Sequence, residues 1–526
     1  MITVTKISKL IIMKTNYILK ALLTITLTFI ITSCGYNEDV IEELSINREF
    51  APVELSTIVR NQTIVELNWT TNENIDHYVV EFSADDPNFT TIFKTVEVTA
   101  DELPIQVQLE GLTEYAIRVK AVSSTGLADS TWAIGSATTL SEQLLFPFSP
   151  GDIGYNQATF KWEAGVNVTQ IVVQPGDVTH DITPQEKTDG IAVVTGLTGD
   201  TQYAATLLNN DKIRGVASFN TEVDPSTGTV IDTNFDLFQM IENAAPGDVL
   251  LIEPGDYTAQ TGTTTIDKPL TIRGLLSYDK PLLSIGIELT NGATDINLIN
   301  LDLDGANSIT DVIEYSEAGN YNSLLISGCN IHDYGRTFIR GNTTDAILQS
   351  IIVENCILTN ILTSGGDFID FRSSDVLNIN VNTSTFNNCA PGRDFFRVDA
   401  SGTSNDTGLI CNIILDSCTL YACSNSSSRR IFYVRFLTND VTSQNNLITD
   451  TESEGYADRS GIDEDPTFNN NNYFNAEGFY DTEQYIFDAN NYTVLDPGFV
   501  DVTTGNFTIT NQALIDSQVG DPRWRP

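Results

Sequence analysis

The second half of the chain repeats a short pattern at nearly constant spacing. Five aligned positions, each next to a short apolar segment, lie 28, 27, 28 and 34 residues apart: Leu301, Cys329, Cys356, Ser384 and Cys418. Small or apolar residues that recur at such a period are typical of a solenoid, in which successive coils stack like positions on one another. The repeat therefore predicts a parallel β-helix and directs the search for function to side chains that neighbouring coils align.

Residues 230–526 are predicted to form this β-helix. Apolar residues fall at helical spacing from Phe235 to Ala244, and a Pro-Gly turn then leads into the apolar run Val249 to Ile252. An amphipathic helix at this place would cap the open end of the core. The segment resembles the start of right-handed β-helices of the pectate lyase-like superfamily. About 300 residues at this period predict about ten coils, and Asp496 to Trp524 is expected to close the far end.

The first half of the chain has the period-two alternation of β-sandwiches. In residues 51–140 the apolar positions alternate with polar ones around Trp69, Tyr78 and Tyr115. A strand tryptophan followed by Leu112-Thr113-Glu114-Tyr115 resembles a fibronectin type III module, in which the leucine and tyrosine form the tyrosine corner. Residues 143–222 are similar to a second, divergent copy, with Leu197 and Tyr203 at its corner. The predicted fold is all-β, with two such sandwiches followed by a right-handed parallel β-helix.

The N-terminus has the features of a targeting segment. Lys14 and Lys20 form a basic region, the apolar run Ala21 to Ile31 follows, and small residues then precede Cys34. The arrangement resembles a bacterial lipoprotein signal, which implies removal of residues 1–33 and acylation of Cys34. Residues 34–50 are predicted to be an acidic tether. Met13 is as plausible a start as Met1.

The order of these segments is similar to that of surface lipoproteins of Bacteroidetes polysaccharide-utilisation loci. The acidic stretch after Cys34 resembles their surface-export signal, which implies the extracellular side of the outer membrane. The resemblance implies glycan handling together with a transporter or enzymes, and it supplies no catalytic signature. A formal net charge of -43 argues against a nucleic-acid partner.

Six cysteines follow Cys34, all between Cys329 and Cys423. Three of them occupy the repeat position, so a buried stack of thiols is favoured over a disulfide framework. Cys389 and Cys423 each follow their coil's repeat position by five residues, and a bridge between them stays open.

Four strands align as ladders on the outside of the predicted β-helix. If their apolar first and third positions point inward, two outward rows result. One row contains Arg340, Asp370, Arg397 and Tyr433, and the next contains Asn342, Arg372, Asp399 and Arg435.

The basic residues of this region are all arginines. From residue 281 onward the chain has eleven arginines and no lysine. The guanidinium fork pairs at two points with a carboxylate, so the ladder fits an acidic, uronate-containing polysaccharide. The alternative is that opposite charges on neighbouring coils pair with each other. The residues expected to contact the glycan are Arg340, Asp370, Arg372, Arg397, Asp399, Tyr433 and Arg435.

Catalysis has less support in the sequence. The chain has three histidines, His77, His180 and His332, which argues against a histidine-rich zinc site and a Ser-His-Asp triad. The reaction that would suit the fold is β-elimination from a uronate, with His332, Tyr334, Arg340 and Tyr433 as its possible participants.

No metal is required by any motif. Asp302-Leu303-Asp304-Gly305 and Asp463-Glu464-Asp465 could hold calcium, although both lack the full ligand set of a known loop. The sequence therefore predicts a surface lipoprotein that binds an acidic polysaccharide, with a β-helix lyase and a structural or adhesive rod as the alternatives.

Overall fold

The computed structural model describes residues 47–341, 343–362, 365–372, 374–398, 410–434, 439–456, 466–480, 487–489 and 491–526. The predicted signal, Cys34 and most of the tether lie outside the described residues. The same is true of Asn342, Asp399, Arg435 and residues 463–465. The chain divides into two units, residues 1–142 and 143–526, which are described separately.

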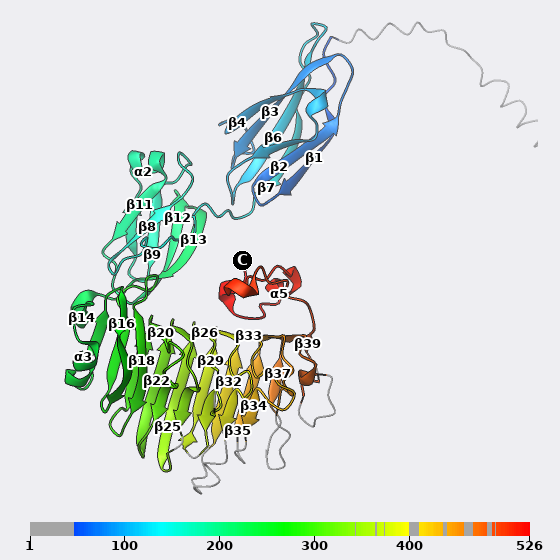
Figure 1. The fold of residues 1–526 in the computed structure, drawn as a ribbon. Coiled ribbons are helices and arrows are strands. Elements are labelled where there is room, and N and C mark those ends of the chain that lie inside the picture. The colour runs from blue at the N-terminus through cyan, green and yellow to red at the C-terminus, as the bar shows by residue number, and fades with distance from the viewer. Residues whose placement is uncertain are drawn as a thin grey trace, which may run out of the picture. The chain divides into compact units, whose positions relative to one another are not determined.

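The first unit is a fibronectin type III-like sandwich of a three-stranded and a four-stranded antiparallel sheet (Figure 1). The sheets are β1 (Val53–Arg60), β2 (Ile64–Thr70) and β5 (Ile105–Gln108), and β4 (Lys94–Val98), β3 (Ile75–Ala84), β6 (Glu114–Ser123) and β7 (Ala133–Thr138). The alternating apolar residues of β2, β3 and β6 are buried between the sheets. Their period-two pattern therefore identified the core face of each strand correctly.

The tyrosine corner is present, but it uses a different leucine from the one predicted. The backbone N–H of Glu110 donates to Tyr115 Oη at 3.0 Å. Leu112 is 45% exposed with a positive φ of 50°, whereas Leu109 is buried. Because Leu112 turns the chain into β6, its side chain points away from the core, and the leucine six residues before the tyrosine takes its place. The prediction that Leu112 forms the corner was wrong.

The second sandwich repeats this plan with fewer strands. β8 (Gln157–Lys161) pairs with β11 (Ile191–Thr195), and the other sheet has the order β10 (Val178–Asp181), β9 (Gln170–Gln174), β12 (Gln202–Asn209) and β13 (Lys212–Asn220). The short helix α2 (Pro184–Asp189) precedes β11. Leu197 is buried six residues before Tyr203, whose Oη accepts from the Thr198 N–H at 2.9 Å. The corner predicted for this copy is confirmed.

A short helix introduces the solenoid, as the apolar spacing predicts. α3 (Leu237–Asn243) has Asp236 as its N-cap, and the Asp236 side chain accepts from the Gln239 N–H. The helix buries Leu237 and Ile241 in the solenoid core. Phe235 lies before the helix and is 45% exposed. The helix therefore contributes two apolar side chains to the core beside the first coils.

The solenoid has three parallel faces, which each complete coil visits in the same order. The first face contains β14 (Thr229–Ile231), β15 (Val249–Ile252), β17 (Leu270–Gly274), β19 (Asp295–Ile299), β22 (Gly319–Ser327), β25 (Ala346–Glu354), β29 (Asn378–Asn382), β32 (Cys411–Asp416), β35 (Asn439–Gln444) and β37 (Thr467–Asn469), with β28 (Asp375–Val376) beside β25. The second face contains β20 (Asp302–Asp304), β23 (Asn330–His332), β26 (Ile357–Thr359), β30 (Thr385–Asn387), β33 (Thr419–Tyr421), β36 (Leu447–Thr449), β38 (Asn471–Phe474) and β39 (Tyr492–Thr493). The third face contains β21 (Asp311–Tyr315), β24 (Thr337–Gly341), β27 (Ile369–Phe371), β31 (Phe396–Val398) and β34 (Phe432–Val434). The long strands β16 (Asp256–Ile266) and β18 (Leu282–Leu289) precede them, and β18 pairs with both β20 and β21.

The repeat position is the corner between the first and second faces. The residue before it has a positive φ in successive coils, namely in Asn300, Gly328, Asn355, Thr383, Ser417, Asn445 and Asn470. Asparagine and glycine tolerate this left-handed conformation, so they turn the chain at little cost. A second corner with a positive φ follows five residues later in the coils from Gly328 onward. Asn388 and Ala422 form it just before Cys389 and Cys423, so these cysteines follow the repeat position of their coils by five residues.

The side chains at the repeat position bind the backbone of the preceding coil. The Cys329 N–H donates to Cys356 Sγ at 3.4 Å, and the Cys356 N–H donates to Ser384 Oγ at 3.1 Å. The Cys418 N–H likewise donates to Asn446 Oδ1. Each corner amide is buried and needs an acceptor, so cysteine, serine and asparagine recur where a purely apolar stack would leave the amide unpaired.

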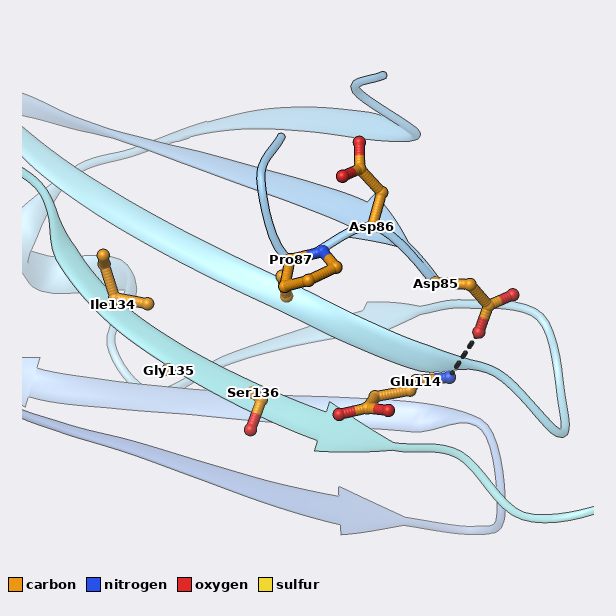
Figure 2. Close-up of a pocket in the computed structure, with 8 residues that line it drawn as sticks. Asp85, Asp86, Pro87, Glu114, Ile134, Gly135 and Ser136 are labelled. Atoms are coloured by element: carbon orange, nitrogen blue, oxygen red, sulfur yellow. Dashed lines mark hydrogen bonds between the residues drawn. The ribbon is translucent and has the colours of Figure 1, made fainter. Parts of the chain in front are cut away.

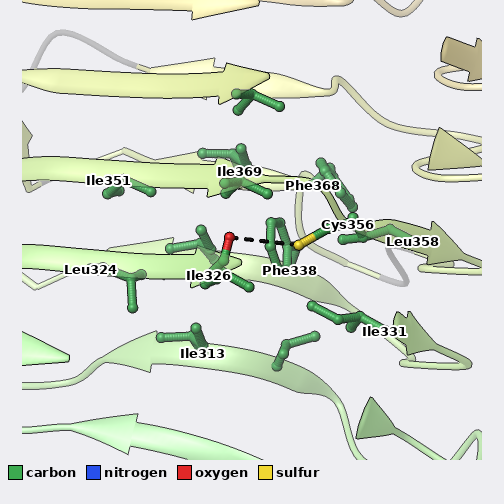
Figure 3. Packing of buried hydrophobic residues seen from close by; sticks show 14 of the residues in the cluster. Ile313, Leu324, Ile326, Ile331, Phe338, Ile351, Cys356, Leu358, Phe368 and Ile369 are labelled. Atoms are coloured by element: carbon green, nitrogen blue, oxygen red, sulfur yellow. Dashed lines mark hydrogen bonds between the residues drawn. The ribbon is translucent and has the colours of Figure 1, made fainter. Parts of the chain in front are cut away.

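The cysteines lie in the apolar core and form no disulfide. All six that follow Cys34 are free and buried, including Cys389 and Cys423, so the predicted thiol stack is confirmed and the open question of a bridge is answered. Figure 3 shows Cys356 among stacked isoleucine, leucine and phenylalanine side chains, with its thiol on the Ile326 carbonyl oxygen at 3.6 Å. Thiols of this kind pack as small apolar groups.

The C-terminal segment covers part of the second face instead of closing the end of the solenoid. Asp521 accepts from Thr385 Oγ1 at 2.7 Å, and Trp524 Nε1 donates to the same hydroxyl oxygen. Leu514 and Val519 pack against Leu447. These residues fold back along the coils and add no turn. The solenoid has about seven turns, fewer than the ten predicted.

Candidate functional site

A row of polar side chains follows the third face of the solenoid, one from each coil. The register pairs Arg340 with Asp370, Asp370 with Arg397, and Arg397 with Tyr433. The predicted alignment of these four residues is therefore present. Glu288 and Glu314 extend the same row on the preceding coils. Neither glutamate was among the predicted residues, although Asp311-Val312-Ile313-Glu314 has two apolar residues between polar ones, as do the later strands.

The second predicted row can be described only at Arg372, because Asn342, Asp399 and Arg435 lie outside the described residues. The guanidinium group of Arg372 turns back toward its own coil. Its Nη2 lies 2.8 Å from an oxygen of Asp367 and 2.9 Å from an oxygen of Asp370. Arg372 thus joins the charges of the first row.

A further polar position lies three residues before the row in each coil. It is occupied by Asp311, Thr337, Asp367, Asp394 and Arg430. Asp367 and Asp394 are almost fully buried, and each accepts a hydrogen bond from the backbone of the next coil, from the Asp394 and Arg430 N–H groups. The regular three-residue offset was the sequence signal for these acids.

Arginine side chains lie over these acids and pair with them, largely across neighbouring coils. Arg340 pairs with Glu314 at 3.1 Å, Arg397 approaches Asp367 at 3.7 Å, and Arg430 approaches Asp394 at 3.6 Å. Arg336, which sequence analysis did not select, donates from Nε to Asp311 at 2.8 Å. Neighbouring coils thus pair their charges, as the alternating signs predict.

The two charges differ in exposure. The side chains of Arg340, Arg372 and Arg397 are 24%, 35% and 21% exposed, whereas those of Asp367 and Asp370 are 0% and 1% exposed. The guanidinium groups therefore form the solvent side of the third face, and the carboxylates lie beneath them. Asp370 lies in this inner layer, so the expectation that it contacts a ligand directly was wrong.

Tyr433 does not offer an open ring. The guanidinium carbons of Arg397 and Arg430 each lie 4.4 Å from the centre of its ring, and the residue is only 6% exposed. Both arginines are therefore held by cation–π contacts. The prediction of a tyrosine platform for a sugar was wrong, because Tyr433 supports the arginines.

Burial changes the proton affinity of the inner acids. Loss of hydration raises the pKa of Asp370 and Asp394 above the usual value, despite the neighbouring arginines. Asp370 Oδ1 and Asp394 Oδ2 have no hydrogen-bond partner. At Asp311 burial acts in the same direction, but hydrogen bonds from Arg336 and Thr337 outweigh it and lower the pKa.

The residues proposed for elimination chemistry do not form a catalytic group. His332 lies on the second face between Asp302, at 3.2 Å, and Asp333, at 2.9 Å. Hydrogen bonding to Asp302 raises the pKa of His332 to about 9, so its ring is protonated at neutral pH and is not available as a base. Tyr334 is buried and donates to the Ile285 carbonyl oxygen.

The same cluster includes one of the two predicted calcium sites. Side-chain donor atoms of Asp304, His332 and Asp333 lie within 4.8 Å of one another, and the Asp302 and Asp304 carboxylates both face the imidazole ring. In this arrangement the acids bind the histidine. The other predicted calcium segment, residues 463–465, lies outside the described residues.

The first sandwich has a pocket of about 530 Å³ that sequence analysis did not anticipate (Figure 2). Its lining includes Asp85, Asp86, Glu114 and the 73% exposed Ile134. Asp86 accepts hydrogen bonds from Thr90 and Thr91, which lower its pKa to about 2. The acids hold the loop that follows β3, and their charge opposes binding of an anion.

Two family models match parts of the solenoid. Residues 255–389 match the domain of unknown function DUF4957, and residues 413–524 match the domain of unknown function DUF5123. No curated protein matches the chain. Within the described residues, no helix is both long enough and apolar enough to cross a membrane.

Solved structures resemble the sandwich part of the chain. A segment of two fibronectin type III domains from chicken tenascin is 18% identical and covers 32% of this chain and 97% of its own, with a TM-score of 0.23. The central fibronectin III array of RIM-binding protein is 21% identical and covers 36% of this chain and 65% of its own, with a TM-score of 0.14. Neither resemblance bears on function.

Proposed function

We propose that the third face of the solenoid binds an acidic polysaccharide, such as a uronate-containing glycan. The observation that supports this proposal most is the outward position of the arginines above a layer of buried carboxylates. Such a surface presents guanidinium groups on successive coils, about 4.8 Å apart along the ladder direction. An extended glycan with a carboxylate on each sugar can meet several of them at once.

The chemistry of arginine suits this ligand. A guanidinium group has five N–H donors, so pairing with one carboxylate leaves donors for another acceptor. The inner acids fix the arginine side chains before the ligand arrives, which lowers the entropy lost on binding. The overall charge of -43 opposes a polyanion at long range, but physiological salt screens that field beyond about 8 Å.

The proposal places this face on a lipid-anchored protein. Acylation of Cys34 would attach the chain to the outer membrane, with the sandwiches as spacers on the extracellular side. In this setting, similar to that of surface lipoproteins of Bacteroidetes polysaccharide-utilisation loci, the pectate lyase-like β-helix captures the glycan. It then transfers the glycan to a transporter or to enzymes.

The experiment compares glycan binding with glycan cleavage. Purified protein is run on native gels cast with polygalacturonate, alginate or pectin, and ultraviolet absorbance at the unsaturated uronate band is followed in solution. We expect retardation in at least one acidic glycan without a rise in absorbance. A rise in absorbance would instead favour the lyase, and the absence of both signals would favour a structural rod.

Variants must remove a guanidinium group without leaving a buried acid alone. Arg340→Gln leaves Glu314 beside Arg336, and Arg397→Gln leaves Asp367 beside Arg372. We expect the double variant to lose at least about tenfold in affinity, because two charge-assisted contacts disappear. Arg60→Gln, which removes an exposed ion pair in the first sandwich, is the matched control. Unchanged retardation of the double variant would refute the proposed face.

A further inference from the structure

A cleft of about 530 Å³ lies where the second sandwich meets the first face of the solenoid. Its floor comes from β15, β17, β19 and β22, and its wall comes from the segments 198–200 and 223–227 of the chain. Ligand sites favour such junctions, and this volume suits two or three sugar units. The third face contributes no residue to the lining.

Hydrogen bonds fix the two sides of the cleft to each other. Arg273 on β17 donates from both Nη atoms to the carboxylate of Asp200, at 3.0 and 3.1 Å. Ser277 donates from its N–H and its hydroxyl group to Glu222, at 2.9 and 2.6 Å. Two-point contacts of this kind hold the wall in one position over the floor, so the cleft is formed before any ligand binds.

Arg273 has a donor that the protein leaves unused. Its side chain is 9% exposed, and its Nε has no hydrogen-bond acceptor. A buried guanidinium N–H without an acceptor is unfavourable by roughly 1–3 kcal/mol. Because this Nε atom has almost no accessible surface, the groups that can meet a ligand are the half-buried polar side chains of the cleft floor.

The floor of the cleft begins an uncharged row along the first face. The row is formed by residues paired in register on successive strands, Thr271, Asn297, Leu325, Ile352, Asn380, Ile414 and Thr442. Within the cleft, Asn297 and Thr271 are joined by a hydrogen bond from Asn297 Nδ2 to Thr271 Oγ1 at 3.0 Å. Amide and hydroxyl groups beside aliphatic side chains match the hydroxyl and C–H groups of a sugar ring.

We propose that this cleft binds a neutral oligosaccharide, whose remaining sugars follow the uncharged row. Asp200 neutralises Arg273, and Asp224 adds a negative charge to the lining, so an anionic glycan is disfavoured there. The site is separate from the arginines of the third face and does not depend on the function proposed for them.

The test uses isothermal titration calorimetry of the purified protein with cellohexaose, xylohexaose and mannohexaose. We expect saturable binding of at least one probe with a Kd of about 1 mM or lower. Asn297→Leu, which keeps the volume of the side chain and removes its amide, should weaken that binding at least about tenfold. Thr271→Val is a second, nearly isosteric variant that should weaken it in the same direction.

Two controls separate this site from the rest of the solenoid. Asn412→Leu changes an amide on a neighbouring row of the first face and should leave the Kd unchanged. The Arg340→Gln and Arg397→Gln double variant should also bind the neutral probe normally while it loses acidic glycan. The inference is overturned if no probe binds saturably, or if Asn297→Leu and Thr271→Val both bind like the parent protein.

Discussion

The first and third faces are built on the same coils, yet their outer surfaces have opposite chemistry. The third face has arginines above buried carboxylates, whereas the central row of the first face carries no charge from Thr271 to Thr442. Both faces have inward rows of isoleucine, leucine, valine and phenylalanine. The comparison shows that stacking fixes the inner residues of a coil and leaves the outer residues free to define a ligand.

The two faces also differ in how their outer residues depend on one another. On the third face each buried acid needs an arginine from its own or a neighbouring coil, since an unpaired buried charge is strongly destabilising. On the first face the outward amides and hydroxyl groups remain close to water. A change on the third face therefore reaches neighbouring coils, whereas a change on the first face stays local.

The largest expected difference concerns Arg372. Arg372→Ala leaves the buried Asp367 and Asp370 without their closest cation, and we expect the free energy of unfolding of the solenoid to fall by about 3 kcal/mol or more. Asn380→Ala on the first face should change it by less than about 0.5 kcal/mol. Urea denaturation followed by circular dichroism measures both. Equal losses of stability in the two variants would contradict the proposed difference between the faces. As a control, Asp370→Asn should restore part of the stability lost in the Arg372→Ala protein.

An intermediate effect concerns salt. Binding of an acidic glycan to the third face should weaken about tenfold between 50 and 500 mM sodium chloride, because the Debye length falls from roughly 14 to 4 Å. Binding of a neutral oligosaccharide in the cleft should change by less than about twofold. Affinity electrophoresis and calorimetry across this range compare the two. A shared salt dependence would mean that both glycans use one site.

The smallest effect concerns one acid on each face. Burial raises the pKa of Asp370, whereas hydrogen bonds from Ser323 and Asn322 lower the pKa of Asp295 on the first face. Stability from Asp295 is present above pH 3.8 and is lost as the pH falls through its folded pKa. For Asp370 the sign reverses. Its carboxylate binds a proton more readily in the folded protein than in the unfolded chain, so the folded protein loses stability as the pH rises above 3.8.

The two asparagine variants should therefore respond to pH in opposite directions. As the pH rises from about 3 to about 6, the stability of the Asp295→Asn protein relative to the parent protein should fall, and that of the Asp370→Asn protein should rise. Each change is expected to stay below about 1 kcal/mol. Urea midpoints at several pH values measure it. The same sign for both variants would contradict the assignment of buried and solvated carboxylates.

The repeat predicted the row of the third face because register in a stacked solenoid follows directly from coil spacing. Arg340, Asp370 and Arg397 align as expected. The depth of each side chain could not be read from the same spacing. Asp370 and Tyr433 lie beneath arginines. This arrangement depends on the way in which the long arginine side chains fold over their neighbours. Leu112 shows the same limit, since one left-handed residue reversed the direction predicted from its place in a motif.

The sequence alone determined the stacking of this chain, because small or apolar residues that recur about every 28 residues become buried together when successive coils stack. It also determined the two sandwiches, through alternation at period two. Only the tertiary structure decided that the C-terminal segment lies on the second face of the solenoid. The same is true of the cleft that the second sandwich forms over the first face of the solenoid. Contacts between residues more than seventy positions apart leave no local pattern, so they become visible only in the folded chain.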